Sequence, residues 1–413
     1  MIRRNFLLGA GGALAGTATA LAWRYWPEQG FWNPCLAQLP RRLASHPLVA
    51  AAWEGLDAAK VWDSHAHLLG TGDSASGIVV NPATESLLNP GHYARRLFFL
   101  NAGCAHQAPG SVDRAYVERL RNLLDGLQEA GGRGVKLLLY AFERAHDDRG
   151  NPDLERSMFY VPDAYARDVA RAHAGVFEWV ASIHPYAGDA LQRLEQARRD
   201  GARAVKWIPS AMNIDPASPR CDPFYAALSK NNLPLVSHAG LERAVLGGRQ
   251  DYGNPLRLRP ALDAGVRVVV AHCASIGTDR DLDKGENGPF VDSFLLFSRL
   301  FEEPRYEKHL FGDISAMTQL NRAGPSLLRV VEREDWHARL LNGSDYPLPG
   351  VMPIFSLDTL VSLGLLEEKF SKTLTEIRAH NPLLFDFVLK RQLRSNGKAL
   401  STRVFETRSF FMR

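Results

Sequence analysis

The feature that most constrains the fold of this chain is a series of short apolar segments separated by longer amphipathic ones. The longer segments place apolar residues at helical spacing, as in AYVERLRNLLDGLQEA (115–130) and ALQRLEQARRDG (190–201). Short apolar segments that alternate with helices are typical of a parallel sheet covered by helices. Eight such units predict a (β/α)8 barrel, the TIM barrel, with strands in 60–68, 134–143, 177–186, 202–210, 233–240, 266–275, 310–317 and 339–347.

Two further segments need an assignment. The apolar residues of RLFFLNAG (96–103) continue a spacing of three or four from Tyr93 to Cys104, which predicts a helix rather than a ninth strand. The charged segment 278–308 follows the sixth predicted strand and is expected to be a lid or a substrate loop.

The composition sets the class of protein. The 413 residues are 46% hydrophobic and 23% charged with a formal net charge of +4, as in a globular protein with a large core. The basic residues are scattered, which argues against a nucleic-acid partner. The four cysteines (Cys35, Cys104, Cys221 and Cys273) form no CxxC pair, so neither a zinc ribbon nor a dense disulfide framework is indicated.

The N-terminus resembles an export signal. Arg3 and Arg4 are followed by Asn-Phe-Leu and an uncharged stretch up to Trp23, and Ala20-Leu21-Ala22 offers a cleavage site. This resembles a twin-arginine signal, while an uncleaved membrane anchor is the alternative. We therefore expect a protein in the periplasm or tethered to the outer face of a bacterial inner membrane, with the export machinery as a partner and membrane contact only through this segment.

The predicted domain organisation has four parts. Residues 1–26 are the export signal or anchor, 27–59 a lead-in segment, 60–392 the barrel and 393–413 a tail. The sequence carries no signal for an oligomeric state.

Polar residues of metal-binding type fall at the ends of the predicted strands. The carboxyl ends of barrel strands meet at one face, where TIM-barrel chemistry is done. Intervals of 32 and 34 residues, from Lys206 to His238 and from there to His272, each match one strand–helix unit. The predicted metal-site residues are His65, His67, Lys206, His238, His272 and Asp345.

Three more polar residues are weaker candidates. Alternate side chains of a strand share a face, so Asp63 is predicted to point the same way as His65 and His67 and to orient them from behind, or else to make a purely structural pair. His184 and Asp313 end the third and seventh predicted strands and are candidate substrate contacts. The alternatives are a turn-capping role for His184 and a buried hydrogen-bond acceptor for Asp313.

The combined pattern resembles the amidohydrolase superfamily, in particular its amidohydrolase-related branch. The resemblance rests on the HxH of His65 and His67, the later strand-end residues and GSDYP around Asp345, and it covers about residues 60–390. It implies a distorted (β/α)8 barrel that holds one or two divalent metal ions, most readily Zn²⁺, which activate water. In two-metal members the equivalent of Lys206 is carboxylated and bridges both ions. Many members of the branch use one ion and lack such a lysine, and Lys206 would then stay charged and pair with Asp345 or a substrate carboxylate.

These features predict a metal-dependent hydrolase of a small-molecule ester, lactone or amide. Asp345 would accept a proton from the attacking water and deliver it to the leaving group. A metal-dependent decarboxylase of the same branch is the first alternative. A non-catalytic binding barrel is the second alternative, although a degenerate site would usually have lost some of the ligands that are present here.

Overall fold

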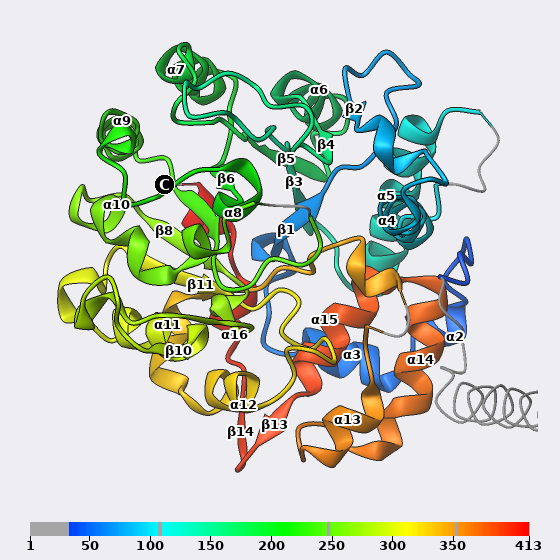
Figure 1. The fold of residues 1–413 in the computed structure, drawn as a ribbon. Helices are drawn as coiled ribbons and strands as arrows, with labels where there is room; N and C mark the ends of the chain where they lie inside the picture. Colours follow the sequence, from blue (N-terminus) through cyan, green and yellow to red (C-terminus); the bar gives the residue numbers. More distant parts are fainter. Residues whose placement is uncertain (1–32, 106–109, 246–247, 352–353, 413) are drawn as a thin grey trace, which may run out of the picture.

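A barrel of parallel strands surrounded by helices forms the centre of the protein (Figure 1). The computed structural model describes residues 33–105, 110–245, 248–351 and 354–412, so the predicted export signal or anchor lies outside the described residues. Each of the eight predicted segments contains a strand: β1 (Trp62–His67), β3 (Lys136–Tyr140), β5 (Phe177–Val180), β6 (Val205–Trp207), β7 (Leu235–His238), β8 (Val268–Ala271), β11 (Leu310–Asp313) and β12 (Leu340–Leu341).

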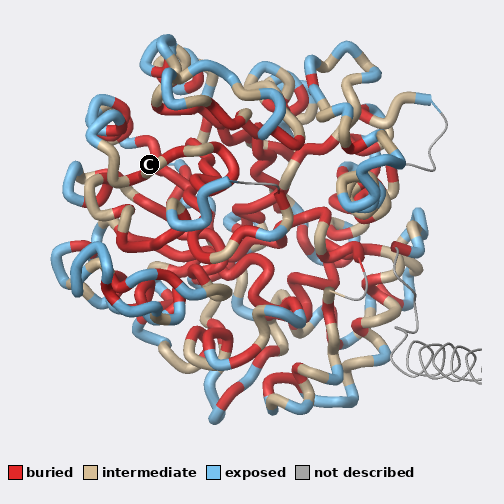
Figure 2. Tube along the Cα trace, in the orientation of Figure 1, coloured by how far each residue is buried: buried red, intermediate tan, exposed pale blue. Residues whose placement is uncertain are grey.

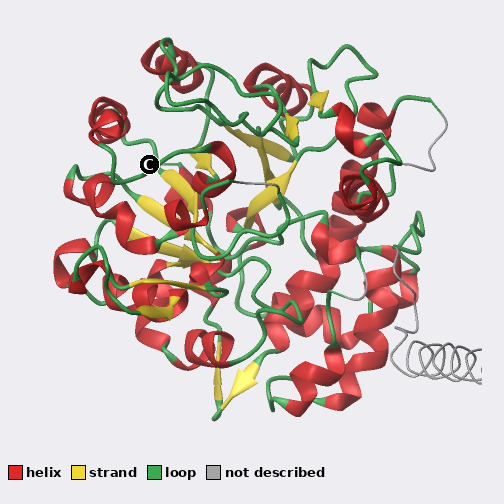
Figure 3. Ribbon diagram, in the orientation of Figure 1, coloured by secondary structure: helices red, strands yellow, loops and turns green. Residues whose placement is uncertain are grey.

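The strands form two parallel sheets that close on each other. One sheet has the order β1-β3-β5 and the other β12-β11-β8-β7-β6. Single parallel bridges join them, Ala181 with Val205 and Ala66 with Tyr346. The backbone N–H of Lys206 donates to Ala181 at 2.7 Å and that of His67 to Tyr346 at 2.9 Å. Closure by isolated bridges makes this a distorted (β/α)8 barrel, as predicted (Figure 3).

A helix follows each barrel strand and covers the outside of the sheet. In α5 the Ser111 side chain accepts from the Arg114 N–H at the first turn, and Tyr116, Leu120 and Leu127 are buried at helical spacing. The covering helices are α5 (Val112–Glu129), α6 (Asp163–Ala172), α7 (Ala190–Arg199), α9 (Asp222–Lys230), α10 (Arg259–Asp263), α11 (Ser293–Phe301), α12 (Pro325–Glu332) and α15 (Pro382–Gln392).

Smaller elements complete the described chain. The helix predicted for 96–103 is confirmed as part of α4 (Pro90–Ala102). The other helices are α2 (Arg41–Ala44), α3 (Pro47–Trp53), α8 (Pro209–Met212), α13 (Leu357–Ser362), α14 (Ser371–His380), α16 (Thr402–Phe405) and α17 (Arg408–Phe411). The antiparallel pairs are β2 (Val79–Val80) with β4 (Phe159–Tyr160), β9 (Thr278–Arg280) with β10 (Phe290–Asp292), and β13 (Arg394–Ser395) with β14 (Lys398–Ala399). Among the described helices, none combines the length and the apolarity that a bilayer-spanning segment needs.

The prediction of a lid or loop over the whole of 278–308 is wrong. Its first half is the hairpin β9–β10, and its second half is α11, which buries Phe294, Phe297 and Phe301 against the barrel. The high density of charge in this segment concealed an apolar helix face that is needed to cover the sheet.

The end of the described chain fills the barrel interior. Phe410 and Phe411 are buried in one apolar cluster with Trp62, which begins β1, and with inward residues of the other strands. The Thr407 hydroxyl donates to the Trp62 carbonyl at 2.6 Å and holds α17 in place. The tail therefore closes the end of the barrel where the strands begin, and most of the chain at the centre of the molecule is buried (Figure 2).

Candidate metal centre

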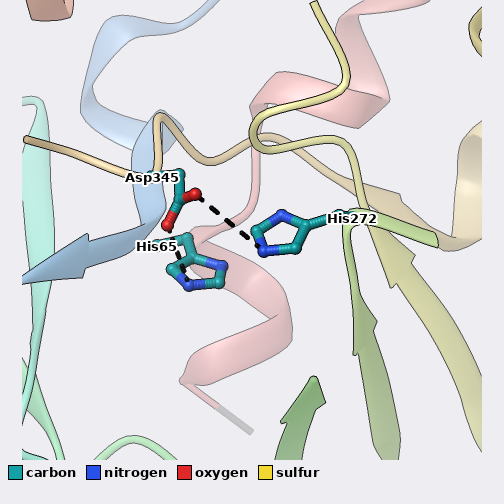
Figure 4. Close-up of side chains that lie close together, drawn as sticks. All are labelled: His65, His272 and Asp345. Atoms are coloured by element: carbon teal, nitrogen blue, oxygen red, sulfur yellow. Dashed lines mark ion pairs between the residues drawn. The ribbon is translucent and has the colours of Figure 1, made fainter. Parts of the chain in front are cut away.

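Three buried side chains converge where the barrel strands end. His65 is on β1, His272 directly follows β8 and Asp345 follows β12, and their ligand atoms all lie within 4.8 Å of one another (Figure 4). Nε2 of His65 is 3.5 Å from one carboxylate oxygen of Asp345, and Nε2 of His272 is 3.9 Å from the other. Two imidazoles and a carboxylate are a typical donor set for a divalent transition metal.

The opposite nitrogens of the two imidazoles have partners of their own. Nδ1 of His65 is 2.9 Å from Oδ2 of Asp313, and Nδ1 of His272 is 3.0 Å from the carbonyl of Ser315. A carboxylate and a carbonyl only accept hydrogen bonds, so each Nδ1 carries the proton. The Nε2 lone pairs then face Asp345, as metal ligation requires, and Nζ of Lys206 also lies 3.4 Å from Nε2 of His65.

Asp313 is the centre of this support. Its Oδ1 accepts the backbone N–H groups of His272 and Ser315, both at 3.0 Å, and the Ser315 hydroxyl as well. It is 1% exposed and does not line the cavity, so the interpretation of Asp313 as a substrate contact is replaced by its alternative, a buried acceptor that orients two histidines.

The backbone around the centre adopts conformations that ordinary residues rarely do. His272, Cys273 and Asp345 have φ values of 55°, 50° and 58°. Left-handed non-glycine residues are uncommon and concentrate at functional sites, because the surrounding structure must hold them in place. Gly343 lies where an added Cβ would come within 2.6 Å of the His65 Cβ, so only glycine lets this turn approach β1.

His67 approaches the same carboxylate from the end of β1. Its Nε2 is 3.2 Å from Oδ1 of Asp345, although His67 does not belong to the compact group of three. The Tyr116 hydroxyl of α5 donates to the His67 carbonyl at 2.6 Å and fixes the end of the strand. His67 is therefore close enough to supply a fourth ligand to a metal ion held by His65, His272 and Asp345.

His238 lies on the cavity but outside that group. Its Nε2 is 3.4 Å from Oε2 of Glu242, whose Oε1 accepts the backbone N–H groups of Ala244 and Val245 at 2.5 and 2.9 Å. Burial lowers the pKa of His238 to about 4, so its imidazole is neutral at physiological pH. A neutral imidazole can bind a metal or accept a proton.

Lys206 is fully enclosed and has no acidic partner in ion-pair contact within the described part of the chain. Its Nζ lies 3.4 Å from Nε2 of His65 and 5.3 Å from the centre of the Tyr140 ring. Burial lowers the pKa of this lysine to about 8, which makes the uncharged amine accessible near neutral pH.

Burial and the contacts within the centre favour particular protonation states of its groups. Burial alone would raise the pKa of Asp345, but the imidazoles of His272 and His65 hold it well below the usual range. Burial lowers the pKa values of His65 and His272. At neutral pH the centre thus offers neutral imidazoles and an ionised carboxylate, the protonation states in which these groups bind metals.

The prediction that Asp63 shares a face with His65 and His67 is wrong. The pairing of β1 with β3 shifts register between Asp63 and Ala66, and this irregularity breaks the alternation on which the prediction depended. Asp63 borders a small cavity with Leu127 of α5 and Leu383 of α15. Its Oδ1 instead accepts the backbone N–H groups of His65 at 3.1 Å and Ser344 at 2.8 Å, so it braces the turn before Asp345.

His184 is not among the cavity-lining residues. Its Nε2 contacts the carbonyl of Met212 at 2.8 Å, its Nδ1 accepts the Tyr186 N–H, and its ring stacks on His146 at 4.0 Å. This geometry fits the alternative, a histidine that caps a turn, and gives no support to a substrate contact.

A cavity of about 260 Å³ opens onto the metal centre. It is lined by every predicted metal-site residue, by an aromatic group that includes Phe99, Phe142 and Phe159, and by several polar residues that were not predicted. The latter are Glu242, Arg95, Arg243, Gln319, Asn321 and Arg322. Arg95 lies on α4, whereas the others lie on loops where the sequence carries no periodic signal.

One protein family and several solved structures are similar to this chain. A family model described as amidohydrolase matches residues 62–355. An uncharacterised TIM-barrel protein from Bordetella bronchiseptica has 18% identity over 77% of this chain and 94% of its own, with a TM-score of 0.45. A proposed 2-pyrone-4,6-dicarboxylic acid hydrolase from Pseudomonas putida has 16% identity over 79% of this chain and 97% of its own, with a TM-score of 0.40. The 5-carboxyvanillate decarboxylase from Sphingomonas paucimobilis has 11% identity over 70% of this chain and 89% of its own, with a TM-score of 0.40. No curated protein matches the chain.

Proposed function

Because this chain belongs to the amidohydrolase family, we propose that it is a metal-dependent hydrolase that cleaves an ester, lactone or amide bond in a small organic substrate. One observation carries the proposal: the Nε2 atoms of His65 and His272 face the Asp345 carboxylate, while Asp313 and Ser315 hold the opposite nitrogens. His67 would add a further ligand. This donor set suits Zn²⁺ and also accepts Fe²⁺ or Mn²⁺.

Asp345 is the proposed general base and general acid. When bound, a divalent ion would acidify a water molecule and polarise the scissile carbonyl. The ionised Asp345 carboxylate would take the proton of the attacking water and return it to the leaving group. Nε2 of His67 lies 3.2 Å from Oδ1 of Asp345, so this histidine is next to the carboxylate that would make the transfer.

Metal content and activity test the proposal together. We expect His65→Ala to lose bound metal, measured by elemental analysis, along with hydrolysis of esters, lactones or acylated amines. Asp345→Asn should lower kcat by about 100-fold or more. His337→Ala is the matched control, because His337 is a buried histidine that contacts the Val330 carbonyl outside the cavity. Full metal occupancy in His65→Ala would refute the proposal.

A metal-dependent decarboxylase is the second candidate. Arg95, Arg243 and Arg322 line the cavity without an ion-pair partner in the described chain, which favours an anionic substrate such as a decarboxylase requires. Release of carbon dioxide during turnover, without a hydrolytic product, would select this reaction. A non-catalytic barrel would show binding without turnover of any kind.

We also propose that the protein is exported from the bacterial cytoplasm. The Arg3-Arg4 pair and the apolar stretch that follows support this location. A disulfide between Cys35 and Cys104 supports it independently, because such bonds persist mainly in oxidising compartments.

A further inference from the structure

We propose that Gln319 and Arg322, on the loop after β11, form a subsite that binds a carboxylate of the substrate. The proposal deepens the proposed function and rests on it for the identity of the cavity as the substrate site. It assigns substrate-binding roles to two residues and restricts the substrate to organic acids.

The loop between β11 and α12 carries both residues to the cavity wall. Nη1 of Arg322 donates to the Ser275 hydroxyl at 3.2 Å, which fixes the guanidinium beside the turn that bears His272. Arg322 lines the same cavity as His272 and His238, so it lies close to the candidate metal centre. An anion held by this arginine would therefore lie next to the groups proposed to do the chemistry.

Both side chains retain unused hydrogen-bond donors. Gln319 is only 4% exposed, yet its Nε2 has no hydrogen-bond partner within the described ranges. Nε of Arg322 is buried and equally unpartnered there, and this arginine forms no ion pair with the described residues. Burying a donor without an acceptor costs free energy, so a native site that contains two of them is suited to an acceptor brought by a ligand.

A carboxylate matches this arrangement better than a neutral group does. The guanidinium presents a planar fork of donors that fits two carboxylate oxygens, and an amide N–H₂ can add a further bond. No acidic side chain of the described residues forms an ion pair with Arg322, and Oε1 of Glu242 accepts the Ala244 and Val245 amides instead. Arg95 and Arg243 add positive charge at the cavity and would attract the same class of ligand.

The rest of the cavity defines the body of the ligand. Phe142 and Phe159 lie 4.3 Å apart between ring centres, and Phe99 lies 6.5 Å from Phe159. This aromatic wall favours a planar apolar group. Benzoate, which joins a carboxylate to a ring, is therefore the probe of choice, and benzamide is its neutral counterpart of equal shape.

Calorimetric titration of the full-length protein, as purified, with benzoate and benzamide tests the subsite. We expect benzoate to bind at least about tenfold more tightly than benzamide. Arg322→Met should remove most of this difference, Arg322→Lys should restore part of it, and Gln319→Leu should weaken benzoate several-fold. Metal content should stay unchanged in all three variants, and Arg198→Met on the exposed face of α7 is the control.

Equal affinity for the two probes, or wild-type benzoate binding by Arg322→Met, would overturn the proposal. Should Arg322→Met fail to fold, Arg322→Lys and Gln319→Leu still decide the question. Unchanged benzoate affinity in Gln319→Leu would refute the substrate-binding role of Gln319. If the protein hydrolyses no ester, lactone or amide but still prefers benzoate, the proposed hydrolase is refuted and the subsite stands. If it hydrolyses neutral esters and shows no preference for acids, the hydrolase stands and the subsite is refuted.

Discussion

At the scale of single residues, the two central imidazoles are oriented by groups that never touch the cavity. Asp313 accepts from Nδ1 of His65, and the Ser315 carbonyl accepts from Nδ1 of His272. Such partners fix the tautomer and the ring plane, so the cost of arranging the ligands is met during folding rather than during metal binding.

Asp313→Asn should weaken metal binding by about 10- to 100-fold, because the amide removes the charge that orients His65 and the backbone of His272. Competition with a chelator of known affinity measures this change. Asp281→Asn is the control, since Asp281 is also buried but pairs with Arg299 away from the cavity. Identical affinities in both variants would show that Asp313 has no part in the centre.

Lys206 determines the expected number of ions. A buried lysine with a pKa of about 8 and no acid in contact can react with carbon dioxide to form a bridging carbamate, as the family resemblance implies. We then expect two ions per chain in bicarbonate buffer, one ion in Lys206→Ala, and partial rescue of that variant by formate. One ion in both proteins, with only substrate affinity reduced in the variant, would make Lys206 an anchor for an anion instead.

The convergence of the six predicted metal-site residues on one cavity could be predicted from the sequence because the ends of parallel strands must meet. The sequence left the role of Asp313 open between a substrate contact and a buried acceptor, and it gave no sign of the register shift in β1 that separates Asp63 from His65 and His67. Gln319 and Arg322 lie on an irregular loop, where no periodicity reports which side chains turn inward.

At the scale of elements, the eight strands were predictable because each lies in a short, largely buried and mostly apolar segment between amphipathic helices. The hairpin β9–β10 and the helix α11 were not separated, because the charged residues on either side of α11 dominate the composition of the whole segment. The closure of the barrel could be inferred only from the number of strands. The bridges that close it, such as Ala66 with Tyr346, join residues far apart in the chain and leave no local sequence pattern.

An ion pair between elements predicts a pH dependence of stability. Glu143, at the end of β3, lies 2.6 Å from Nη1 of Arg193 on α7. Burial alone would raise its pKa, but contacts with His146 and Arg193 lower it from 4.5 to about 2. Because the folded pKa is depressed, the stabilisation is complete above pH 4.5 and is lost as the pH falls toward 2, by about 3 kcal/mol in all.

Glu143→Gln should therefore flatten the acid limb of the stability curve, measured by chemical denaturation between pH 6 and pH 3. Glu195→Gln on α7, where the carboxylate is at the surface, should change stability by less than about 0.5 kcal/mol. Parallel acid limbs in the wild type and Glu143→Gln would contradict the assignment.

At the scale of the whole molecule, the disulfide links the lead-in segment to the cavity wall. Cys104 lies just beyond α4, whose residues Arg95 and Phe99 line the cavity, and Cys35 belongs to the segment before the barrel. A cross-link over 69 residues restricts the unfolded chain and is expected to contribute about 2–4 kcal/mol.

Replacing Arg3 and Arg4 by lysine together should strand the protein in the cytoplasm, where Cys35 and Cys104 would stay reduced. Fractionation and thiol labelling measure location and redox state in the same sample. A Lys398→Arg variant, altered far along the chain, should be exported normally. Export of the double variant at the wild-type level would exclude the twin-arginine signal.

The placement of Phe410 and Phe411 in the barrel interior has a consequence for biosynthesis. The ribosome makes these residues hundreds of positions after Trp62, with which they share one apolar cluster. The interior therefore stays open to water until the last turn of α17 has left the ribosome, and folding can be completed only after synthesis of this turn. A chain cut short by a few residues would expose this cluster to quality-control proteases, so a membrane transport system that accepts only folded cargo would receive only chains translated through this turn.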